Sequence, residues 1–175
     1  MFRTLKGLAV LALVAATAGT AQAQGIKFGL HGGAGMPTGT LGEGFGTGYQ
    51  IGGELSFKPA VLPIGLRADV DFNSFGMKEG IEGSLRVISG SANAVHRMPM
   101  PAFAPYLLGG VGLYNAKLSM DDVDGEGSSE VGFQIGAGVE LNLAGMATAL
   151  EVKLVNVMTE GEASRYVPVT FRIMF

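Results

Sequence analysis

Few side chains in this sequence could perform catalytic chemistry. His31 and His96 are the only histidines, and the chain contains no cysteine. Nucleophilic catalysis by serine needs a histidine that activates the hydroxyl and an acid that orients the histidine. Neither histidine has a serine-and-acid motif beside it, and the absence of cysteine excludes thiolate catalysis, disulfides and thiolate-bound metals. The residues therefore predict a protein that is not an enzyme and binds no cofactor.

The segment "DDVDGE", from Asp121 to Glu126, could bind a cation through its carboxylates. A calcium loop of the EF-hand type needs acidic groups at alternating positions and a glutamate at the twelfth. Met120 occupies one of the required positions. We therefore expect a solvated acidic loop, with weak binding of divalent cations as the alternative.

A larger set of charged residues lies at alternate positions within otherwise apolar or glycine-rich segments. Buried charges are tolerated only when they are paired and hydrogen-bonded. The alternation predicts that Lys27 lies beside Glu54, Glu54 beside Arg67, and Arg172 between Glu151 and Lys27. We expect these residues to form an internal network of salt bridges, with a gated ion path as the alternative. The predicted network consists of Lys27, Glu54, Arg67, Glu140, Glu151, Lys153 and Arg172.

The N-terminal region resembles a leader for export. Arg3 and Lys6 precede an apolar run over residues 7–16, and small residues end the segment at Ala23. This layout predicts a secretory signal peptide over residues 1–23 and a mature domain over residues 24–175. A membrane anchor is the weaker interpretation, because a spanning helix needs about 20 apolar residues. Removing the two basic residues changes the formal charge from −3 to −5, which does not favour nucleic-acid binding.

Hydrophobic residues make up 47% of the chain and charged residues only 15%, yet no long apolar run follows residue 23. The apolar residues instead alternate with small or polar ones, which is the pattern of a β-strand. The 29 glycines leave few windows for a stable helix. The alternation predicts eight strands, at about 25–36, 47–58, 63–74, 84–97, 104–118, 130–142, 147–157 and 165–175.

The two faces of these strands indicate which side is buried. In "VGFQIGAGVEL", alternate residues from Val131 to Leu141 are apolar, while the opposite face is mostly glycine. Across the strands the polar face consists of glycine, alanine and serine with isolated charges, which would make a poor solvated exterior. It suits the narrow lumen of an eight-stranded barrel whose apolar face meets lipid. A secreted ligand-binding barrel is the alternative. We assign no faces to strands four and five.

The connections differ between the two ends of the predicted barrel. One end carries the longer, more acidic segments, and we expect these loops to be extracellular and both mature termini to be periplasmic. Aromatic residues near strand ends are expected to form interface girdles: Tyr49, Phe57, Phe72, Phe75, Phe103, Tyr106, Tyr114 and Tyr166.

Four segments resemble the small outer-membrane β-barrel domain proteins, similar to the OmpA-type eight-stranded transmembrane barrel. They are "APYLLGGVGLYN" (104–115), "GFQIGAGVELNL" (132–143), "ALEVKLV" (149–155) and the terminal "VPVTFRIMF". The resemblance covers residues 24–175 and implies an eight-stranded antiparallel up-and-down barrel in the outer membrane of a Gram-negative-type cell. It also implies that Phe171, Ile173 and Phe175 form a C-terminal signal for the barrel-assembly machinery.

The expected role is structural or in surface interaction, with a lumen filled by side chains and no wide pore. A small-solute or ion channel and a lipid A-modifying barrel enzyme are the alternatives. The expected partners are outer-membrane lipid and lipopolysaccharide, together with the assembly machinery during biogenesis. We expect a monomer that binds no nucleic acid and no metal.

Overall fold

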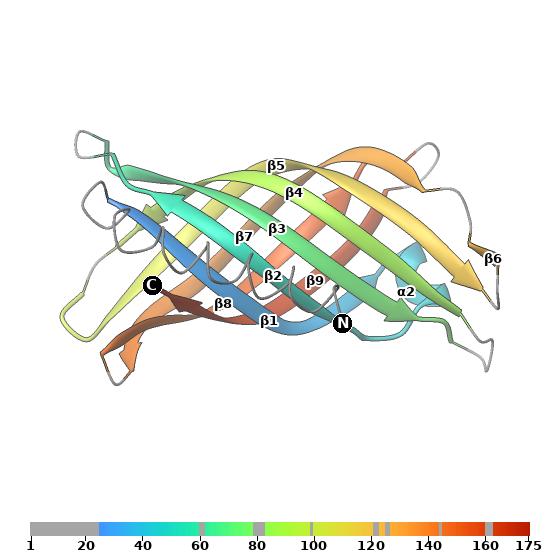
Figure 1. The fold of residues 1–175 in the computed structure, drawn as a ribbon, viewed down its shortest axis with the longest axis horizontal. Coiled ribbons are helices and arrows are strands. Elements are labelled where there is room, and N and C mark those ends of the chain that lie inside the picture. The colour runs from blue at the N-terminus through green and yellow to red at the C-terminus, as the bar shows by residue number, and fades with distance from the viewer. Residues whose placement is uncertain are drawn as a thin grey trace, which may run out of the picture.

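Eight long antiparallel strands form a closed barrel in the computed structural model (Figure 1). The structure describes residues 25–59, 62–78, 83–98, 100–120, 123–124, 127–143, 145–159 and 163–175, so the predicted signal peptide lies outside the described residues. The barrel strands are β1 (Ile26–Thr38), β2 (Gly48–Phe57), β3 (Ile64–Gly76), β4 (Gly83–Arg97), β5 (Phe103–Met120), β7 (Ser128–Leu143), β8 (Met146–Val157) and β9 (Ser164–Met174). The predicted eight-stranded fold is confirmed.

Closure of the barrel depends on two pairings. They are the pairing of β4 with β5 and the pairing of β1 with β9. With the hairpin pairings, each barrel strand has a partner on both sides. Phe28 and Phe175 extend the β1–β9 seam by exchanging backbone hydrogen bonds of 3.3 and 2.7 Å. A closed sheet has no unpaired edge.

Two short elements were not expected from the sequence. The helix α2 (Thr40–Gly44) follows β1, and the two-residue strand β6 (Val123–Asp124) pairs with the end of β5. Both are too short for hydrophobic periodicity to reveal them. They lie at the end of the barrel opposite the C-terminus (Figure 1). Within the described ranges, no helix has the length and apolarity needed to cross a membrane.

The apolar face of the strands points outward. Leu30, Val70, Leu113, Ile135 and Leu150 are each more than half exposed, although all are large and hydrophobic. The structure also assigns the faces of strands four and five. In β4, Ser89, Ser91 and Asn93 are buried, whereas Ile88 is exposed. The next outward positions after Ile88 are Gly90, Ala92 and Ala94, whose small size weakens the alternation.

Glycine on the inward face makes room for large side chains of neighbouring strands. A Cβ atom at Gly52 would lie 2.4 Å from the Nε2 atom of His31, and one at Gly138 would lie 2.4 Å from the Tyr106 ring. At Gly132 the nearest atom would be 2.7 Å away, in the ring of Tyr114. The glycine-rich face is therefore the complement of a filled lumen.

The β1–β9 seam provides a test of closure. A Cβ atom at Gly33 would lie 1.9 Å from the carbonyl oxygen of Val169, so the two backbones would have to move apart. Such overpacking costs about 1–3 kcal/mol or more. We expect Gly33→Ala to lower the folded fraction, measured by the gel migration of unboiled against boiled samples in detergent, and to lower the urea midpoint.

Gly32→Ala is the matched control for this substitution. The nearest atoms to a Cβ at Gly32 are 3.5 and 3.7 Å away, which is ordinary contact. Equal folding of the two variants would contradict the tight seam.

Candidate functional site

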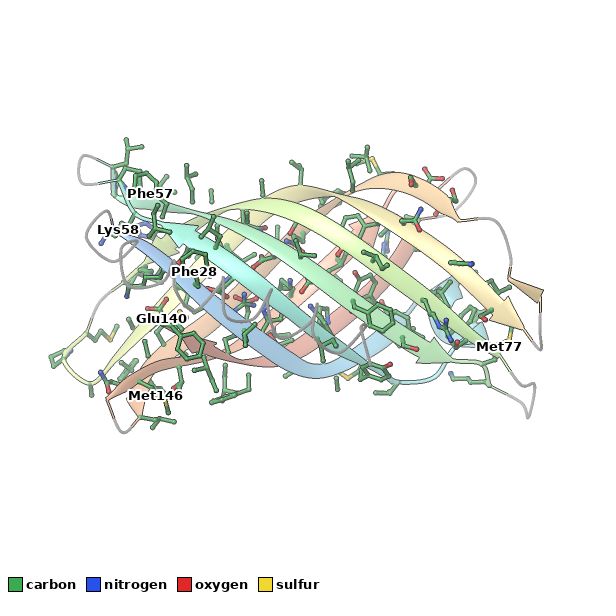
Figure 2. All side chains as sticks on the ribbon, viewed as in Figure 1. Phe28, Phe57, Lys58, Met77, Glu140 and Met146 are labelled. Atoms are coloured by element: carbon green, nitrogen blue, oxygen red, sulfur yellow. The ribbon has the colours of Figure 1, made fainter. Side chains whose placement is uncertain are left out.

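The lumen is filled by three layers of side chains. Side chains project both outward and into the barrel along its length (Figure 2). One apolar cluster lies toward the end that carries α2, and a second lies toward the end that carries the C-terminus. Between them is a layer of buried charged and polar residues, which we call the charged layer. Its charged members are His31, Glu54, Arg67, Asp69, Asp71, Glu151, Lys153 and Arg172.

Arg172, on β9, has the most ionic partners in the charged layer. Its guanidinium donates to Glu54 from two nitrogens, the Nε bond measuring 2.6 Å. It also donates to Glu151 at 2.6 Å and to Asp69 at 3.1 Å. The three carboxylates come from β2, β8 and β3. One side chain therefore connects four strands across the lumen.

Arg67, on β3, completes this cluster. Its two terminal nitrogens donate to the two carboxylate oxygens of Glu151 at 2.7 and 3.0 Å, and its Nε donates to Asp69 at 3.1 Å. Glu151 accepts a further bond from the hydroxyl of Tyr106 at 2.7 Å. Bidentate pairing of this kind is both strong and directional. The side chains of Arg67 and Glu151 are almost fully buried, so solvent screens the pair little.

Asp71 organises the second cluster. The Nε2 atom of His31 lies 2.5 Å from its carboxylate, and Gln50 donates to the same oxygen at 2.6 Å. Lys153 donates to the other oxygen at 3.5 Å. Across the whole layer, four carboxylates meet two guanidiniums, one ammonium and one imidazole, so the charges nearly balance.

Neutral side chains extend the layer. Asn93 donates to Asp69 at 2.8 Å, and Gln134 donates to Asn93 at 2.7 Å and to Ser91 at 2.9 Å. On the adjoining strands β3, β2, β1 and β9, some buried atoms have no partner: Nδ1 of His31, Oε1 of Gln50, both amide atoms of Asn73 and Oγ1 of Thr170. Buried polar groups are usually hydrogen-bonded. This region is therefore the least satisfied part of the described lumen.

Five of the seven charged residues expected to form the network lie in the charged layer: Glu54, Arg67, Glu151, Lys153 and Arg172. Glu140 forms a separate pair with Arg97 at 2.6 Å, in which each side chain is about one-fifth exposed. Glu140 lies near the end that carries the C-terminus (Figure 2). Lys27 is exposed and does not belong to the layer, although it has the lumen-facing position in β1.

The register differs from the predicted neighbours. Lys27 lies opposite Ser56 rather than Glu54, and Glu54 lies opposite Asp69 rather than Arg67. Arg172 lies opposite His31 and Ala149. Its ion pairs with Glu54 and Glu151 are diagonal, because a long side chain in a narrow lumen reaches beyond its directly opposite residue. Alternation predicts which face a residue occupies but not this offset.

Three charged-layer residues were missing from the predicted network: His31, Asp69 and Asp71. The alternation of "LRADVDF" places Asp69 and Asp71 on the same face as Arg67, so the signal was present in the sequence. His31 alternates with Gly29 and Gly33 in the same way.

Four of the eight aromatic residues expected in the girdles face the lumen instead. Phe75, Tyr106, Tyr114 and Tyr166 are at most 3% exposed. Phe75 and Tyr166 pack edge to face, with ring centroids 5.4 Å apart, in the cluster near α2. The rings of Phe75, Tyr106 and Tyr114 fill space beside inward glycines. The location of an aromatic residue near a strand end does not distinguish this role from that of an interface girdle.

One group of side chains has the composition of a metal site. Ligand atoms of His31, Glu54 and Asp69 all lie within 4.8 Å of one another. Both carboxylates are already bonded to Arg172, and the Nε2 atom of His31 is bonded to Asp71. A metal ion would have to displace the guanidinium, so these residues are better suited to an ion pair. His96 lies on the outward face of β4 and does not join this group.

Comparison with known proteins identifies the family. A family model described as "Outer membrane protein beta-barrel domain" matches residues 7–159. No curated protein sequence matches the chain.

Several solved structures share the fold at low sequence identity. Neisserial surface protein A is 13% identical, with a TM-score of 0.68 over 86% of this chain and 96% of that chain. A major outer membrane protein of Thermus thermophilus is 15% identical, with a TM-score of 0.53 over 86% and 99%. The Yersinia pestis outer membrane protein Ail, in a phospholipid bilayer nanodisc, is 17% identical, with a TM-score of 0.51 over 86% and 99%.

Removing Arg172 tests how strongly the charged layer stabilises the barrel. Arg172→Ala would leave three buried carboxylates with fewer partners, and breaking a buried ion pair costs about 3–5 kcal/mol. We expect a loss of that size in the free energy of unfolding, measured by urea titration of the barrel in detergent with circular dichroism.

The control for this substitution is Arg97→Ala, which breaks the partly exposed pair with Glu140. Pairs of this type contribute about 1 kcal/mol or less. If the two variants unfold at the same urea concentration, the charged layer has no special role in stability.

Proposed function

Because the chain belongs to the outer membrane protein β-barrel domain family, we propose that it is a closed outer-membrane barrel with a structural or surface-interaction role. The observation that carries this proposal is the charged layer held by Arg172 between two apolar clusters. Solutes that crossed the lumen would have to separate buried ion pairs and displace packed rings. The protein would therefore act through its surface and not as a wide pore.

The proposed orientation places the C-terminal end of the barrel in the periplasm. The opposite end carries the connections at 39–47, 77–82, 121–127 and 158–163, which include α2 and β6. The end near the C-terminus has the connections at 58–63, 98–102 and 144–145. Long extracellular loops and short periplasmic turns are general in these barrels. The longer set would then be extracellular and available to a partner.

The names of two proteins with the same fold support a surface role. One is a neisserial surface protein, and the other is the attachment invasion locus protein of Yersinia pestis. We extend to this chain only the general role of contact at the cell surface. The predicted assembly signal at Phe171, Ile173 and Phe175 is part of the proposal, and all three residues lie on the outward side of the terminal segment. Lipopolysaccharide and the barrel-assembly machinery are the proposed partners. The proposed oligomeric state is a monomer.

A gated ion path is the second candidate function. The unpartnered polar atoms of His31, Gln50, Asn73 and Thr170 favour it, because they lie beside the charged layer on adjoining strands. Passage would require the bonds of Arg172 to open. Conductance separates this candidate from a closed barrel.

Cysteine labelling tests the proposed orientation. The chain has no native cysteine, and Lys78 and Lys58 are exposed lysines at opposite ends of the barrel. We expect Lys78→Cys to react with a membrane-impermeant maleimide in intact cells, because the loops at that end would be extracellular. The matched variant Lys58→Cys should react only after the outer membrane is permeabilised. The reverse pattern would contradict the orientation.

Conductance in planar bilayers tests the closed lumen. We expect no stable single-channel steps from the wild-type barrel or from Arg172→Ala, because the apolar clusters remain in place on both sides of the charged layer. Steps from the wild type would contradict a closed lumen. Steps that appear only in Arg172→Ala would support the gated path.

A further inference from the structure

Four buried side chains on adjoining strands have polar atoms without a partner among the described residues. They are His31 on β1, Gln50 on β2, Asn73 on β3 and Thr170 on β9. All four face the lumen, and none is more than 6% exposed. Buried polar groups are nearly always hydrogen-bonded. Four neighbouring exceptions in one part of the lumen therefore indicate a ligand that they bind together.

The strand register places three of these side chains at one level of the barrel. Gln50 lies directly opposite Asn73 in the β2–β3 pairing. Gly33 of β1 lies opposite Gln50 on one side and opposite Thr170 on the other. We call Gln50, Asn73 and Thr170 the polar level. His31 is two residues before Gly33, so it points to the same side of β1 and lies next to the polar level, within the charged layer.

The unpartnered atoms are mostly hydrogen-bond acceptors. Gln50 donates its amide nitrogen to Asp71 at 2.6 Å, which identifies the unpartnered Oε1 as an acceptor. Oδ1 of Asn73 and Oγ1 of Thr170 also have lone pairs, and Nδ2 of Asn73 is a donor. A carboxylate only accepts, so Nε2 of His31 carries the proton in its 2.5 Å contact with Asp71. Nδ1 of the neutral ring is then a fourth acceptor, and four acceptors suit a cation.

The charged layer beside the polar level has one positive charge too few. Its four carboxylates face two guanidiniums and one ammonium, and a neutral His31 adds no charge. Arg97 and Glu140 form a separate pair that is neutral as a unit. Buried charge is costly unless a partner compensates it. One monovalent cation would balance the layer, whereas a divalent cation would leave an excess of positive charge.

We infer that the polar level, together with Nδ1 of His31, binds one monovalent alkali cation, Na⁺ or K⁺, inside the closed barrel. Amide and hydroxyl oxygens would replace part of the hydration shell of the ion, as oxygens do in other cation sites of proteins. The site uses Nδ1 of His31, so it leaves the bonds of Arg172 to Glu54 and Asp69 intact. It depends neither on the orientation of the barrel nor on its role at the cell surface.

Unfolding in different salts tests this site. The purified barrel in nonionic detergent is titrated with urea in NaCl, in KCl and in choline chloride of equal ionic strength, and unfolding is followed by circular dichroism. Choline is a monovalent cation that is too large for a packed lumen. We expect a higher urea midpoint in NaCl or KCl than in choline chloride. An ion at ten times its Kd shifts the folding equilibrium by about elevenfold when it binds only the folded state.

Two substitutions remove oxygens of the polar level without removing a hydrogen bond within the described residues: Asn73→Leu and Thr170→Val. Both variants should lose the difference between the alkali salts and choline chloride. Asn93→Leu is the matched control, because Asn93 is a buried asparagine whose amide donates to Asp69 and accepts from Gln134. This control should lower the midpoint in every salt and keep the difference between salts.

Three outcomes would overturn the site. The first is an equal midpoint of the wild type in all three salts, a result that requires no variant. The second is an Asn73→Leu barrel that is more stable than the wild type in every salt, because replacing an unpaired buried polar group by an apolar one removes its desolvation cost. The third is a midpoint that changes with pH and not with the cation, which would assign the missing charge to a proton on His31. If Asn73→Leu does not fold, Thr170→Val decides, since valine has nearly the shape of threonine.

The salt experiment and the conductance experiment fail independently. Single-channel steps from the wild type would overturn the closed lumen, and the cation-specific shift of the urea midpoint would still stand. Equal midpoints in all salts would remove only the cation site and leave the proposed closed barrel as it is.

Discussion

The contact between Arg172 and its three carboxylates is the interaction on which the interior depends. It joins β9 to β2, β3 and β8 through Glu54, Asp69 and Glu151. Backbone pairing connects each strand only to its two neighbours. Apolar side chains that face lipid do not draw strands together, because lipid tails are as apolar as the side chains. Side chains that bridge the lumen therefore supply cohesion between strands that do not pair directly. They are favourable only as a complete set, because a buried charge without a partner is costly.

The charged layer in turn depends on the space that glycine leaves. Eight strands enclose a lumen just wide enough for side chains. A long residue such as Lys153 can occupy it only when a neighbouring position is empty, and Gly136 provides that space, since a Cβ there would lie 3.0 Å from the Lys153 side chain. The apolar clusters at both ends then separate the ion pairs from bulk water, which strengthens their electrostatic attraction. Space, charge and exclusion of water thus act together.

Much of this could be predicted from the sequence, because a closed barrel repeats one local rule. Each strand alternates with period two, so the strands and the buried position of Arg172 follow from short windows of sequence. The rule fails where both faces have similar residues, as in β4, where Gly90 and Ala92 lie outward. Alternation also does not give the cross-strand register. The sequence therefore predicted Lys27 beside Glu54, whereas it lies opposite Ser56. Register is set by hydrogen bonds between distant segments, and the direction of a ring such as Tyr106 depends on a glycine in another strand.

Charged side chains inside the barrel and those outside it have different surroundings. Inside, both signs occur together and nearly balance, because no solvent is available to screen an excess. Outside, the charged residues on the described barrel strands are Arg86, Lys117 and Arg165, all toward the end that carries α2. An excess of one sign that would be costly in the lumen is tolerated at the ends of the strands, because water screens exposed charges there. The distribution of charge therefore differs between the buried lumen and the outer surface of the barrel.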